Sequence, residues 1–448
     1  MDVLAEWTGL LRPNHELTPI FCTSLADAMR DRKLTFGDRV HCSVLRPFFL
    51  SAADEARIRE ASERIAAIGE RVAAAATTDR RLLTALGVSD AEERLIRIDP
   101  GYARASTASR LDAFLLADSL HFAEYNAESP AGPAYTQRLC ELFDGLDIMT
   151  AFRRRVTVSY HQTIPPLLAA LLESYREWGG RASPPAMAIV DWREVPTWTE
   201  FELLRDAFLH EGIPTTICDP GDLTFDGGVL RGGGQPIDLV YRRVLINDII
   251  ARADECSALV KAYESRAVCV ANTLRCKLPH KKAFFAVLTD PAFAEFQDAA
   301  DQAIVRAHVP WTRLVADVQT ERRGRTESLL ALARRDREQL VLKPNDEYGG
   351  TGVLLGWEER ESAWEAALER ALSDPPGTWV VQERIPVRRE VFPHFDSIGR
   401  VVMRDMLVDL APYLFRGKLG GYLTRLSTSG LANVTSGGGQ VPAFVVDV

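Results

Sequence analysis

Apolar residues recur at helical spacing in the first part of the chain. Between residues 51 and 76 they fall three or four positions apart among charged residues, at Ile58, Ala61, Ile65, Ile68 and Val72. This spacing predicts an amphipathic helix, and the pattern at 39–45 predicts a short strand before it. We therefore expect residues 1–100 to be mostly helical and to serve as structural cover.

The middle of the chain alternates between helices and short apolar strands. A helical pattern covers 137–178, and four further segments follow it: a strand at 186–190, a helix at 197–210, and strands at 214–218 and 237–241. Strands separated by helices of this length predict a parallel sheet. Arg242 and Arg243 come after the last strand, where two guanidinium groups can clamp a carboxylate. An ordinary surface ion pair is the alternative.

A hairpin is predicted over residues 110–126, with its turn near 118–119. In that register position 112 lies opposite 124, and 110 lies opposite 126. Because side chains alternate along a strand, one face then carries four polar residues: Arg110, Asp112, Glu124 and Asn126. The other residues expected on this face are apolar: Phe114, Leu116, Leu120 and Phe122. Hard oxygen ligands suit Mg²⁺, whereas a solvated hairpin end is the alternative.

The turn after this hairpin, residues 129–132, reads Ser-Pro-Ala-Gly. It precedes a helix, so its backbone N–H groups could bind a ligand at the start of that helix.

A glycine-rich stretch at 341–356 reads as a strand, a turn and a second strand. Lys343 ends the first strand, Glu347 follows four residues later, and the turn contains Gly349, Gly350 and Gly352. Glycines without Cβ let backbone N–H groups close over phosphate oxygens, while the lysine neutralises phosphate charge and the carboxylate holds Mg²⁺. An ordinary hairpin with a glycine-rich turn is the alternative. Neither a P-loop nor a dinucleotide-binding fingerprint occurs.

Three further stretches bear on binding. Pro279 is predicted to start a helix with Lys281 and Lys282 in its first turns, where they face either an anion or solvent. The strand at 379–385 contains Gln382 and Glu383, and exposed amides at its end would read an adenine edge and ribose hydroxyls; an edge strand is the alternative. The tail from 420 is strand-like, with Arg425, Asn433 and a glycine run at 437–439 that either closes over a site or forms a turn.

Composition narrows the class of protein. A chain of 448 residues predicts two or three domains. The formal net charge of −9 argues against a broad nucleic-acid surface. No apolar run approaches the ~20 residues that a membrane span needs, and the first residues lack the pattern of a secretion signal. Seven scattered cysteines without a C-x-x-C pair suit reduced thiols, so we expect a soluble cytoplasmic protein. Oligomeric state has no signal in the sequence.

The order of these motifs resembles the circularly permuted ATP-grasp family. The motifs are R-x-D, E-x-N-x-x-x-P-A-G, Y-R-R, N…K-K-A, K-P-x-x-E-x-G-G-x-G, V-V-Q-E-R-I and R…N…G-G-G. Within the family the chain is most similar to the synthetase domain of glutathionylspermidine synthetase, and more distantly to eukaryotic glutathione synthetase. The resemblance covers about residues 100–448. The amidase domain that accompanies many glutathionylspermidine synthetases has no counterpart in residues 1–100, so we do not expect an amidase activity.

The resemblance implies an α/β protein with a circularly permuted ATP-grasp fold, an inserted Rossmann-like (pre-ATP-grasp) layer and an N-terminal helical region. The implied domains are 1–100, mostly helical; 101–180, a permuted segment with the metal-binding hairpin; 181–270, the Rossmann-like substrate side; and 271–448, the nucleotide-binding subdomains.

The resemblance also implies a role for each motif residue. Mg²⁺ ligands are Asp112, Glu124, Asn126 and Glu347. ATP phosphates are contacted by Lys343 and Lys282, with Lys281 as the competing register, and covered by Gly349, Gly350 and Gly352. Adenine and ribose are read by Gln382, Glu383 and Ile385. Arg110 steadies the transferring phosphoryl group, and the substrate contacts are Ser129, Arg243 (Arg242 competes) and Arg425.

The implied activity is an ATP-dependent carboxylate–amine ligase that works through an acyl phosphate and releases ADP and phosphate. Its cofactors are ATP and Mg²⁺, and its partners are a small-molecule or peptide carboxylate and an amine, without nucleic acid or membrane. The basic residues favour an acidic or peptide-like carboxylate, and the net acidity favours a cationic amine. A phosphotransferase and a nucleotide-binding module without turnover are the alternatives.

Overall fold

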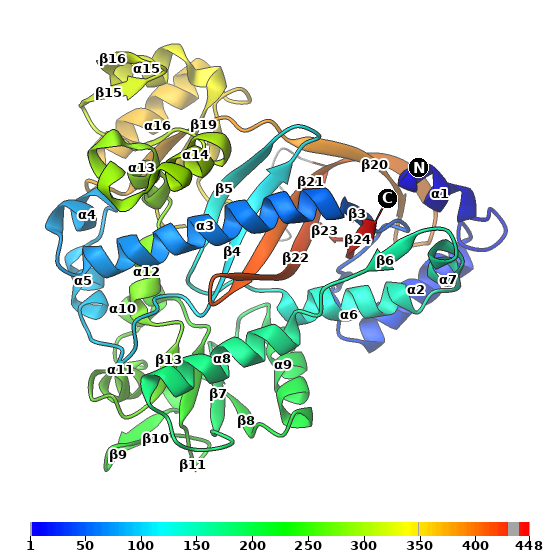
Figure 1. Cartoon of the computed structure of the whole chain (residues 1–448), viewed down its shortest axis with the longest axis horizontal. Coiled ribbons are helices and arrows are strands. Elements are labelled where there is room, and N and C mark those ends of the chain that lie inside the picture. The colour runs from blue at the N-terminus through cyan, green and yellow to red at the C-terminus, as the bar shows by residue number, and fades with distance from the viewer. Residues whose placement is uncertain (1, 348, 429–438, 448) are drawn as a thin grey trace.

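The computed structural model describes residues 2–347, 349–428 and 439–447, and a six-stranded antiparallel sheet lies at its centre (Figure 1). The strands run in the order β23-β22-β21-β4-β5, and β20 also pairs with β21. Their bounds are β4 Ala108–Leu115, β5 Leu120–Asn126, β20 Arg388–Phe395, β21 Val401–Phe415, β22 Lys418–Ser427 and β23 Gly439–Gln440. One edge of β21 is shared, because β20 pairs with residues 401–408 and β4 pairs with residues 413–415. Strands β20 and β4 therefore diverge beside residues 409–412 of β21.

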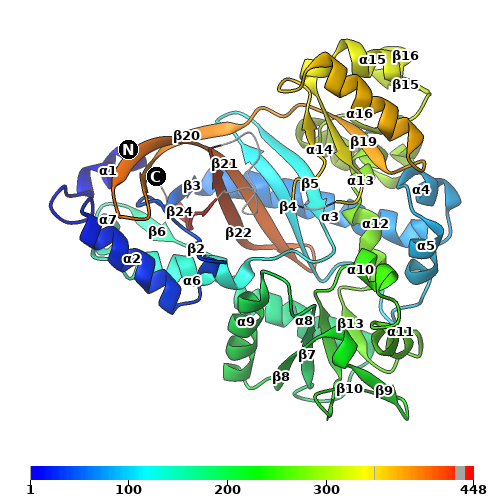
Figure 2. The same cartoon turned by 180° about the vertical axis from the view of Figure 1, so that it is seen from behind.

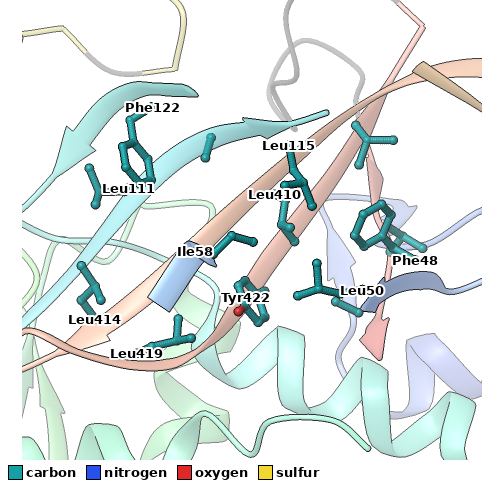
Figure 3. Close-up of a cluster of buried hydrophobic side chains, with 14 of the residues drawn as sticks. Phe48, Leu50, Ile58, Leu111, Leu115, Phe122, Leu410, Leu414, Leu419 and Tyr422 are labelled. Atoms are coloured by element: carbon teal, nitrogen blue, oxygen red, sulfur yellow. The ribbon is translucent and has the colours of Figure 1, made fainter. Parts of the chain in front are cut away.

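The long helix α3 (Ala52–Ala76) covers one face of this sheet, as the apolar spacing predicts. Ser51 caps it by accepting a hydrogen bond from the Asp54 amide at 3.0 Å. Ile58 of α3 packs in a cluster with apolar residues of the sheet, shown in Figure 3: Leu111, Leu115, Phe122, Leu410, Leu414, Leu419 and Tyr422.

The predicted parallel layer is present as a four-stranded sheet in the order β13-β12-β7-β8. The strands are β7 Met187–Val190, β8 Thr215–Cys218, β12 Leu239–Arg242 and β13 Cys269–Ala271, and all neighbours are parallel. Apolar residues of α8 (Ile164–Trp178) and α9 (Trp198–His210) pack on one face, and those of α10 (Ile246–Ala251) and α11 (Ser257–Glu264) pack on the other. Both faces are therefore buried, which is the usual condition of parallel sheets.

A third sheet has the order β14-β19-β17-β18. Its strands are β14 Thr312–Leu314, β17 Leu340–Pro344, β18 Leu354–Leu355 and β19 Trp379–Glu383, and apolar residues of α15 (Leu329–Arg335) and α16 (Glu361–Ser373) pack on it. The strand, glycine turn and strand predicted at 341–356 form β17 and β18. β19 lies between β14 and β17, so the edge-strand alternative is wrong.

Other boundaries differ from the sequence pattern. Pro279 lies inside the short helix α12 (Lys277–His280), and the next helix, α13 (Ala283–Thr289), begins after both lysines. The expected strand at 39–45 is reduced to β2 (Arg39–Val40). The helical span at 137–178 contains α6 (Pro133–Asp144), α7 (Asp147–Arg153) and α8, with the strand β6 (Thr157–Ser159) between α7 and α8.

The remaining elements complete the periphery (Figure 2). Strand β24 (Ala443–Asp447) runs parallel to β3 (Phe48–Ser51) and antiparallel to β6. The others are α1 Val3–Leu10, α2 Pro19–Asp31, β1 Thr35–Phe36, α4 Arg80–Ala85, α5 Asp90–Ile96, β9 Thr224–Asp226, β10 Val229–Gly232, β11 Gln235–Pro236, α14 Ala299–His308, β15 Gln319–Arg322 and β16 Arg325–Ser328. Among the described helices, none has the length and apolar character needed to cross a membrane.

Candidate nucleotide and substrate site

A cavity of about 430 Å³ lies where the three sheets meet, which is within the usual size range of ligand pockets. Its walls come from the β4–β5 hairpin, from β17 and the turn after it, from β19, from β21 and β22, and from the ends of β7 and β12. Thirteen of the sixteen sequence-predicted site residues line it: Arg110, Asp112, Glu124, Asn126, Ser129, Arg243, Lys343, Gly349, Gly350, Gln382, Glu383, Ile385 and Arg425. Lys282, Glu347 and Gly352 lie outside this lining.

The polar end of the hairpin has the predicted register. Arg110 pairs with Asn126 and Asp112 pairs with Glu124, and all four side chains reach the cavity. Asn126 Nδ2 donates to Glu124 Oε1 at 3.0 Å. The solvated-end alternative does not describe Arg110 and Asp112, which are buried.

The apolar part of the hairpin departs from the prediction because of a β-bulge. The register shifts after Asp112, so that Ala113 pairs with Phe122 and Ala123 becomes the extra residue. Phe122 therefore faces α3 together with Leu111 and Leu115 (Figure 3), while Phe114 remains on the cavity wall. The expectation that Phe122 shares a face with Glu124 is wrong. Bulges commonly re-aim side chains beside functional sites.

Alternating charges cross the cavity wall from β21 to β4. Arg425 Nε donates to Asp409 Oδ2 at 2.6 Å, and Arg425 Nη2 donates to Asp112 Oδ2 at 2.5 Å. Arg110 Nε donates to Asp112 Oδ1 at 2.8 Å. Burial opposes ionisation of Asp112, but Arg110 and Arg425 outweigh it and hold its pKa well below the ordinary value.

Asp409 is the one residue of this row of alternating charges that was not predicted from the sequence. Its second oxygen, Oδ1, accepts the Ala113 amide at 3.2 Å, directly after the bulge and at the point where β4 has left β21. Burial raises its pKa, although Arg425 opposes the shift. A charged residue within an apolar strand sequence was the signal available.

Lys343 is held by Gln382. Its Nζ donates to Gln382 Oε1 at 2.6 Å and lies 3.4 Å from the Ala123 carbonyl, while Gln382 Nε2 donates to Thr312 Oγ1 at 3.1 Å. The Gln382 side chain is thus engaged within the protein. Burial lowers the pKa of Lys343 to about 8, and the positive charge of Lys282 adds to the effect.

The first amides at the end of β19, which were predicted to be exposed, are hydrogen-bonded within the protein. The Glu383 amide donates to the Trp311 carbonyl at 2.8 Å, and the Arg384 amide donates to the Gln339 carbonyl at 2.8 Å. Glu383 Oε1 accepts from Arg322 at 2.8 Å and from Arg323 at 2.6 Å. The expectation of exposed amides at the end of this strand is therefore wrong at residues 383 and 384, and Ile385 is the next residue on the cavity wall.

The two candidate lysines separate clearly. Lys282 Nζ lies 3.5 Å from Glu124 Oε2 and donates to the Glu347 carbonyl at 2.5 Å. Lys281 Nζ instead lies between Glu92, at 2.9 Å, and Asp346, at 3.2 Å. Lys282 is therefore the lysine directed at the hairpin carboxylate, and the Glu347 residue beside it is exposed.

All three glycines of the turn have positive φ, at 71°, 76° and 72° for Gly349, Gly350 and Gly352. A Cβ on Gly352 would come 2.7 Å from Pro344 Cγ, so this position excludes other residues. Gly349 and Gly350 face the cavity. The predicted contacts at Asn433 and in the glycine run at 437–438 lie outside the described residues.

The paired arginines also separate. Arg242 is fully buried and donates to the Asn272 carbonyl at 3.1 Å and to Glu128 Oε1 at 3.3 Å, which is a structural role. Arg243 lines the cavity and donates through Nη1 to the Pro130 carbonyl at 2.6 Å.

The turn before α6 does not offer its amides to the cavity. The amides of Gly132 and Ala134 donate to Glu200 Oε1, at 2.7 and 3.3 Å, so a buried carboxylate already binds this helix start. Ser129 Oγ donates to the Arg243 carbonyl at 2.6 Å. The expectation of free amides at this helix start is therefore wrong.

The cavity donors fit Mg²⁺ held together with phosphates. Within the described residues, no three His, Cys, Asp or Glu side chains are grouped so that they could hold a metal alone. Glu124 and Asn126 present carboxylate and amide oxygens beside Lys343, and both oxygens of Asp112 bind arginines. Mg²⁺ commonly takes one or two carboxylates plus substrate phosphates, which matches this arrangement.

Comparison with known proteins places the fold. A solved glutathione synthetase-like effector from Globodera pallida, in its apo form, superposes with a TM-score of 0.62 over 95% of this chain and 96% of its own, at 12% identity. The chain therefore has a glutathione synthetase-like fold.

The curated sequence relatives are much longer than this chain. "Putative glutamate–cysteine ligase 2-3" from Frankia alni is 26% identical over 63% of this chain, and "Putative glutamate–cysteine ligase 2-2" from Frankia casuarinae is 23% identical over 58%. The chain spans about a third of the length of these curated relatives, since the alignments cover 32% and 29% of them. No family model matches the chain. The finer resemblance to glutathionylspermidine synthetase stays a prediction.

Proposed function

We propose that the cavity binds Mg²⁺·ATP and that the protein joins a carboxylic acid to an amine. The observation that carries this proposal is one cavity shared by a lysine, a glycine turn, a carboxylate–amide pair and three arginines, two from the central sheet and one from the end of β12. The names of the relatives and the glutathione synthetase-like fold support it. The permuted ATP-grasp order and the four domain limits belong to the same proposal.

The nucleotide would lie between the glycine turn and the hairpin. Lys343 and Lys282 would neutralise phosphate oxygens under the Gly349–Gly350 backbone. Gln382 keeps Lys343 in place, and the Glu383–Ile385 segment would border the base and ribose. Glu124 and Asn126, with Glu347 from the turn, would hold Mg²⁺.

Asp112 would join these ligands only after its arginines turn away. Both of its oxygens bind guanidinium groups in the structure. Phosphate oxygens compete well for arginine, because the bonds are charge-assisted and often bidentate. A bound phosphoryl group would therefore draw Arg110, and Arg425 as a substrate contact, away from Asp112.

The reaction then follows from charge placement. A carboxylate oxygen attacks the γ-phosphorus and ADP leaves, which forms an acyl phosphate. The amine nitrogen attacks the acyl carbon, the C–O bond to phosphate breaks, and phosphate and a proton are released. Phosphoryl transfer mainly requires positioning and charge stabilisation, which Arg110, the lysines and Mg²⁺ would supply. Ser129 and Arg243 would face the substrate.

Hydroxylamine trapping tests this function. Purified protein, Mg²⁺·ATP and a panel of amino acids and short peptides are incubated with hydroxylamine, which converts an acyl phosphate into a hydroxamate. We expect hydroxamate and ADP in equal amounts for at least one acid. ADP with a stable phosphorylated product instead would indicate a phosphotransferase, and ATP binding without either product would indicate a module without turnover.

A further inference from the structure

Two neighbouring parallel strands end at the cavity. Along the chain the parallel sheet proceeds from β7 to β8 on one side, and then returns to β12 and β13 on the other side of β7. The direction of winding therefore reverses between β7 and β12. Ligands of open α/β sheets bind at the carboxyl ends of strands at such a switch point. Asp191 directly follows β7, Arg243 directly follows β12, and both line the cavity.

Arg243 is committed to the protein at this end of the cavity. Besides Pro130, its Nη1 donates to the Tyr241 hydroxyl at 3.1 Å, and its Nη2 lies 3.9 Å from Glu200 Oε2. Arg243 is 3% exposed and Glu200 is fully buried, so the two charges balance each other. The guanidinium Nε of Arg243 is buried and has no hydrogen-bond partner among the residues that the structure describes. Because Arg243 also faces Glu200, it neutralises the charge of Asp191 only in part.

Asp191 is a nearly buried carboxylate on the cavity wall, 7% exposed. Its Oδ1 accepts the amide of the next residue, Trp192, at 2.9 Å. Burial raises its pKa to about 6 although Arg243 attracts the charged form, and the half-buried Asp248 on the same wall raises it further. Burial also raises the pKa of Asp248, and the positive charges of Arg252 and Lys277 oppose that shift. A nearly buried carboxylate next to a half-buried one favours a cation in the cavity beside them.

The surroundings select the kind of cation. Carbon atoms of Val195, Pro196 and Leu245 form the neighbouring wall. An apolar wall beside two carboxylates suits an organic ammonium ion, whose carbon chain can leave water while its charged head is paired.

We propose that Asp191 and Asp248 form the amine subsite of the cavity, which receives the ammonium group of the amine substrate with its carbon chain against Val195, Pro196 and Leu245. This inference rests on the proposed function, since it assigns the amine of that reaction to one end of the same cavity. The turn at 129–131 connects this end to the phosphoryl end. Ser129 binds the Arg243 carbonyl, and Arg110 Nη1 donates to the Ala131 carbonyl at 3.2 Å.

The test compares two probes with one carbon chain, butylamine and butan-1-ol, which carry an ammonium and a hydroxyl group. Each is titrated calorimetrically into the protein with Mg²⁺ and a non-hydrolysable ATP analogue. We expect butylamine to bind the wild type more tightly than butan-1-ol, and Asp191→Asn to weaken butylamine by about 10-fold or more, because it loses a charge-assisted contact. Butan-1-ol should not distinguish the variants.

Asp226→Asn is the matched control, because Asp226 is exposed on β9, a strand of the separate three-stranded sheet β11-β10-β9, and does not line the cavity. Equal binding of the two probes to the wild type, no butylamine binding at all, or equal butylamine affinities of Asp191→Asn and Asp226→Asn would each overturn the subsite. Should Asp191→Asn fail to fold, Asp248→Asn at its half-buried position carries the same comparison.

Parallel titrations with Mg²⁺·ATP separate this inference from the proposed function. Nucleotide binding and hydroxamate formation without any effect of Asp191→Asn on butylamine would remove the amine subsite alone. Butylamine binding that depends on Asp191, in a protein that binds no Mg²⁺·ATP, would retain the cation site and remove the ligase.

Discussion

Several buried charges in the cavity are held in place by hydrogen bonds or ion pairs within the protein. Asp112 binds two arginines, Arg425 binds two aspartates, and Lys343 is fixed by Gln382. Removing one member of a buried pair usually costs about 3–5 kcal/mol, because the other charge stays in a poor solvent. Single substitutions must therefore be chosen so that they change one property of a side chain at a time.

Lys343 gives a pH dependence that an ordinary lysine would not. With a pKa of about 8 it is protonated and can bind phosphate below that pH, and it loses its charge as the pH rises through it. We expect the affinity for Mg²⁺·ATP to be constant between pH 6.5 and 7.5 and to fall by about 10-fold per pH unit above the free-state pKa of about 8, up to the higher pKa that the lysine has beside the bound phosphate. The affinity is measured by calorimetry across this range.

Lys343→Arg is the control for this profile, because a guanidinium stays charged over the whole range. The break should disappear in that variant. A wild-type affinity that stays level up to pH 9.5 would contradict a phosphate contact by Lys343.

The Glu124 carboxylate is held by Asn126 and Lys282, whereas Asp112 beside it is held by arginines. Glu124→Gln keeps the shape of the side chain and removes its charge. We therefore expect the gain in ATP affinity on adding Mg²⁺ to be smaller in this variant than in the wild type, by about 10-fold or more. Glu369→Gln, on an exposed position of α16, serves as the control. An unchanged Mg²⁺ dependence would exclude Glu124 from the metal site.

At the scale of elements, the site depends on a fork beside β21. Strand β20 pairs with β21 up to Val408 and β4 pairs from Tyr413, so the edge of β21 between them has no ladder partner in either strand. Asp409 lies in this gap and binds the Ala113 amide after the bulge. The fork, the bulge and Asp409 together turn the polar end of the hairpin toward the cavity.

The sequence predicted this hairpin only as far as local periodicity reaches. Alternation placed Asp112 opposite Glu124 correctly, because side chains alternate regularly along both strands up to that pair. The extra residue Ala123 was not foreseeable, since the contacts at the bulge come from distant strands: Lys343 meets the Ala123 carbonyl across a separation of 220 residues, and Asp409 binds the Ala113 amide across 296. The amides of Glu383 and Arg384 were mispredicted for the same reason, as their acceptors are the carbonyls of Trp311 and Gln339.

Gly132, at the start of α6, is a sharp test of how these elements meet. Its φ is 109°, and a Cβ would lie 2.4 Å from the hydroxyl oxygen of Tyr413 on β21. We expect Gly132→Ala to lower the free energy of unfolding by about 3 kcal/mol, through backbone strain and the clash. Urea denaturation measures the change.

Gly179→Ala is the matched control, because Gly179 has a φ of 97° but nothing within 4 Å of its added Cβ. That variant should report the backbone strain alone, about 1 kcal/mol. Adding Tyr413→Phe to Gly132→Ala removes the clashing oxygen and should restore part of the loss. Equal costs at the two glycines would show that α6 adjusts freely.

At the scale of the whole molecule, three sheets contribute to one cavity. The parallel layer was predictable from its alternating strands and helices, because these contacts are short in sequence. Its position beneath the hairpin (Figure 2) was not, since it depends on contacts between distant residues, such as Arg243 with the Pro130 carbonyl, 113 residues apart.

A nucleotide held between the glycine turn of the third sheet and the hairpin of the central sheet should stabilise both sheets together. At a concentration of 100 times its Kd, Mg²⁺·ATP should add about 2.7 kcal/mol to the free energy of unfolding. We expect a rise in Tm of several degrees by scanning calorimetry, and none when EDTA replaces Mg²⁺. A shift confined to one of several separate transitions would contradict a shared cavity.

The most direct measurement is a calorimetric titration of ATP into the wild type and Lys343→Ala, each with Mg²⁺ and with EDTA. The account predicts one binding site per chain in the wild type with Mg²⁺, much weaker binding with EDTA, and loss of binding in Lys343→Ala despite a native circular dichroism spectrum. Binding that is unchanged by EDTA and by Lys343→Ala, or no binding to the wild type, would contradict the assignment of this cavity to Mg²⁺·ATP.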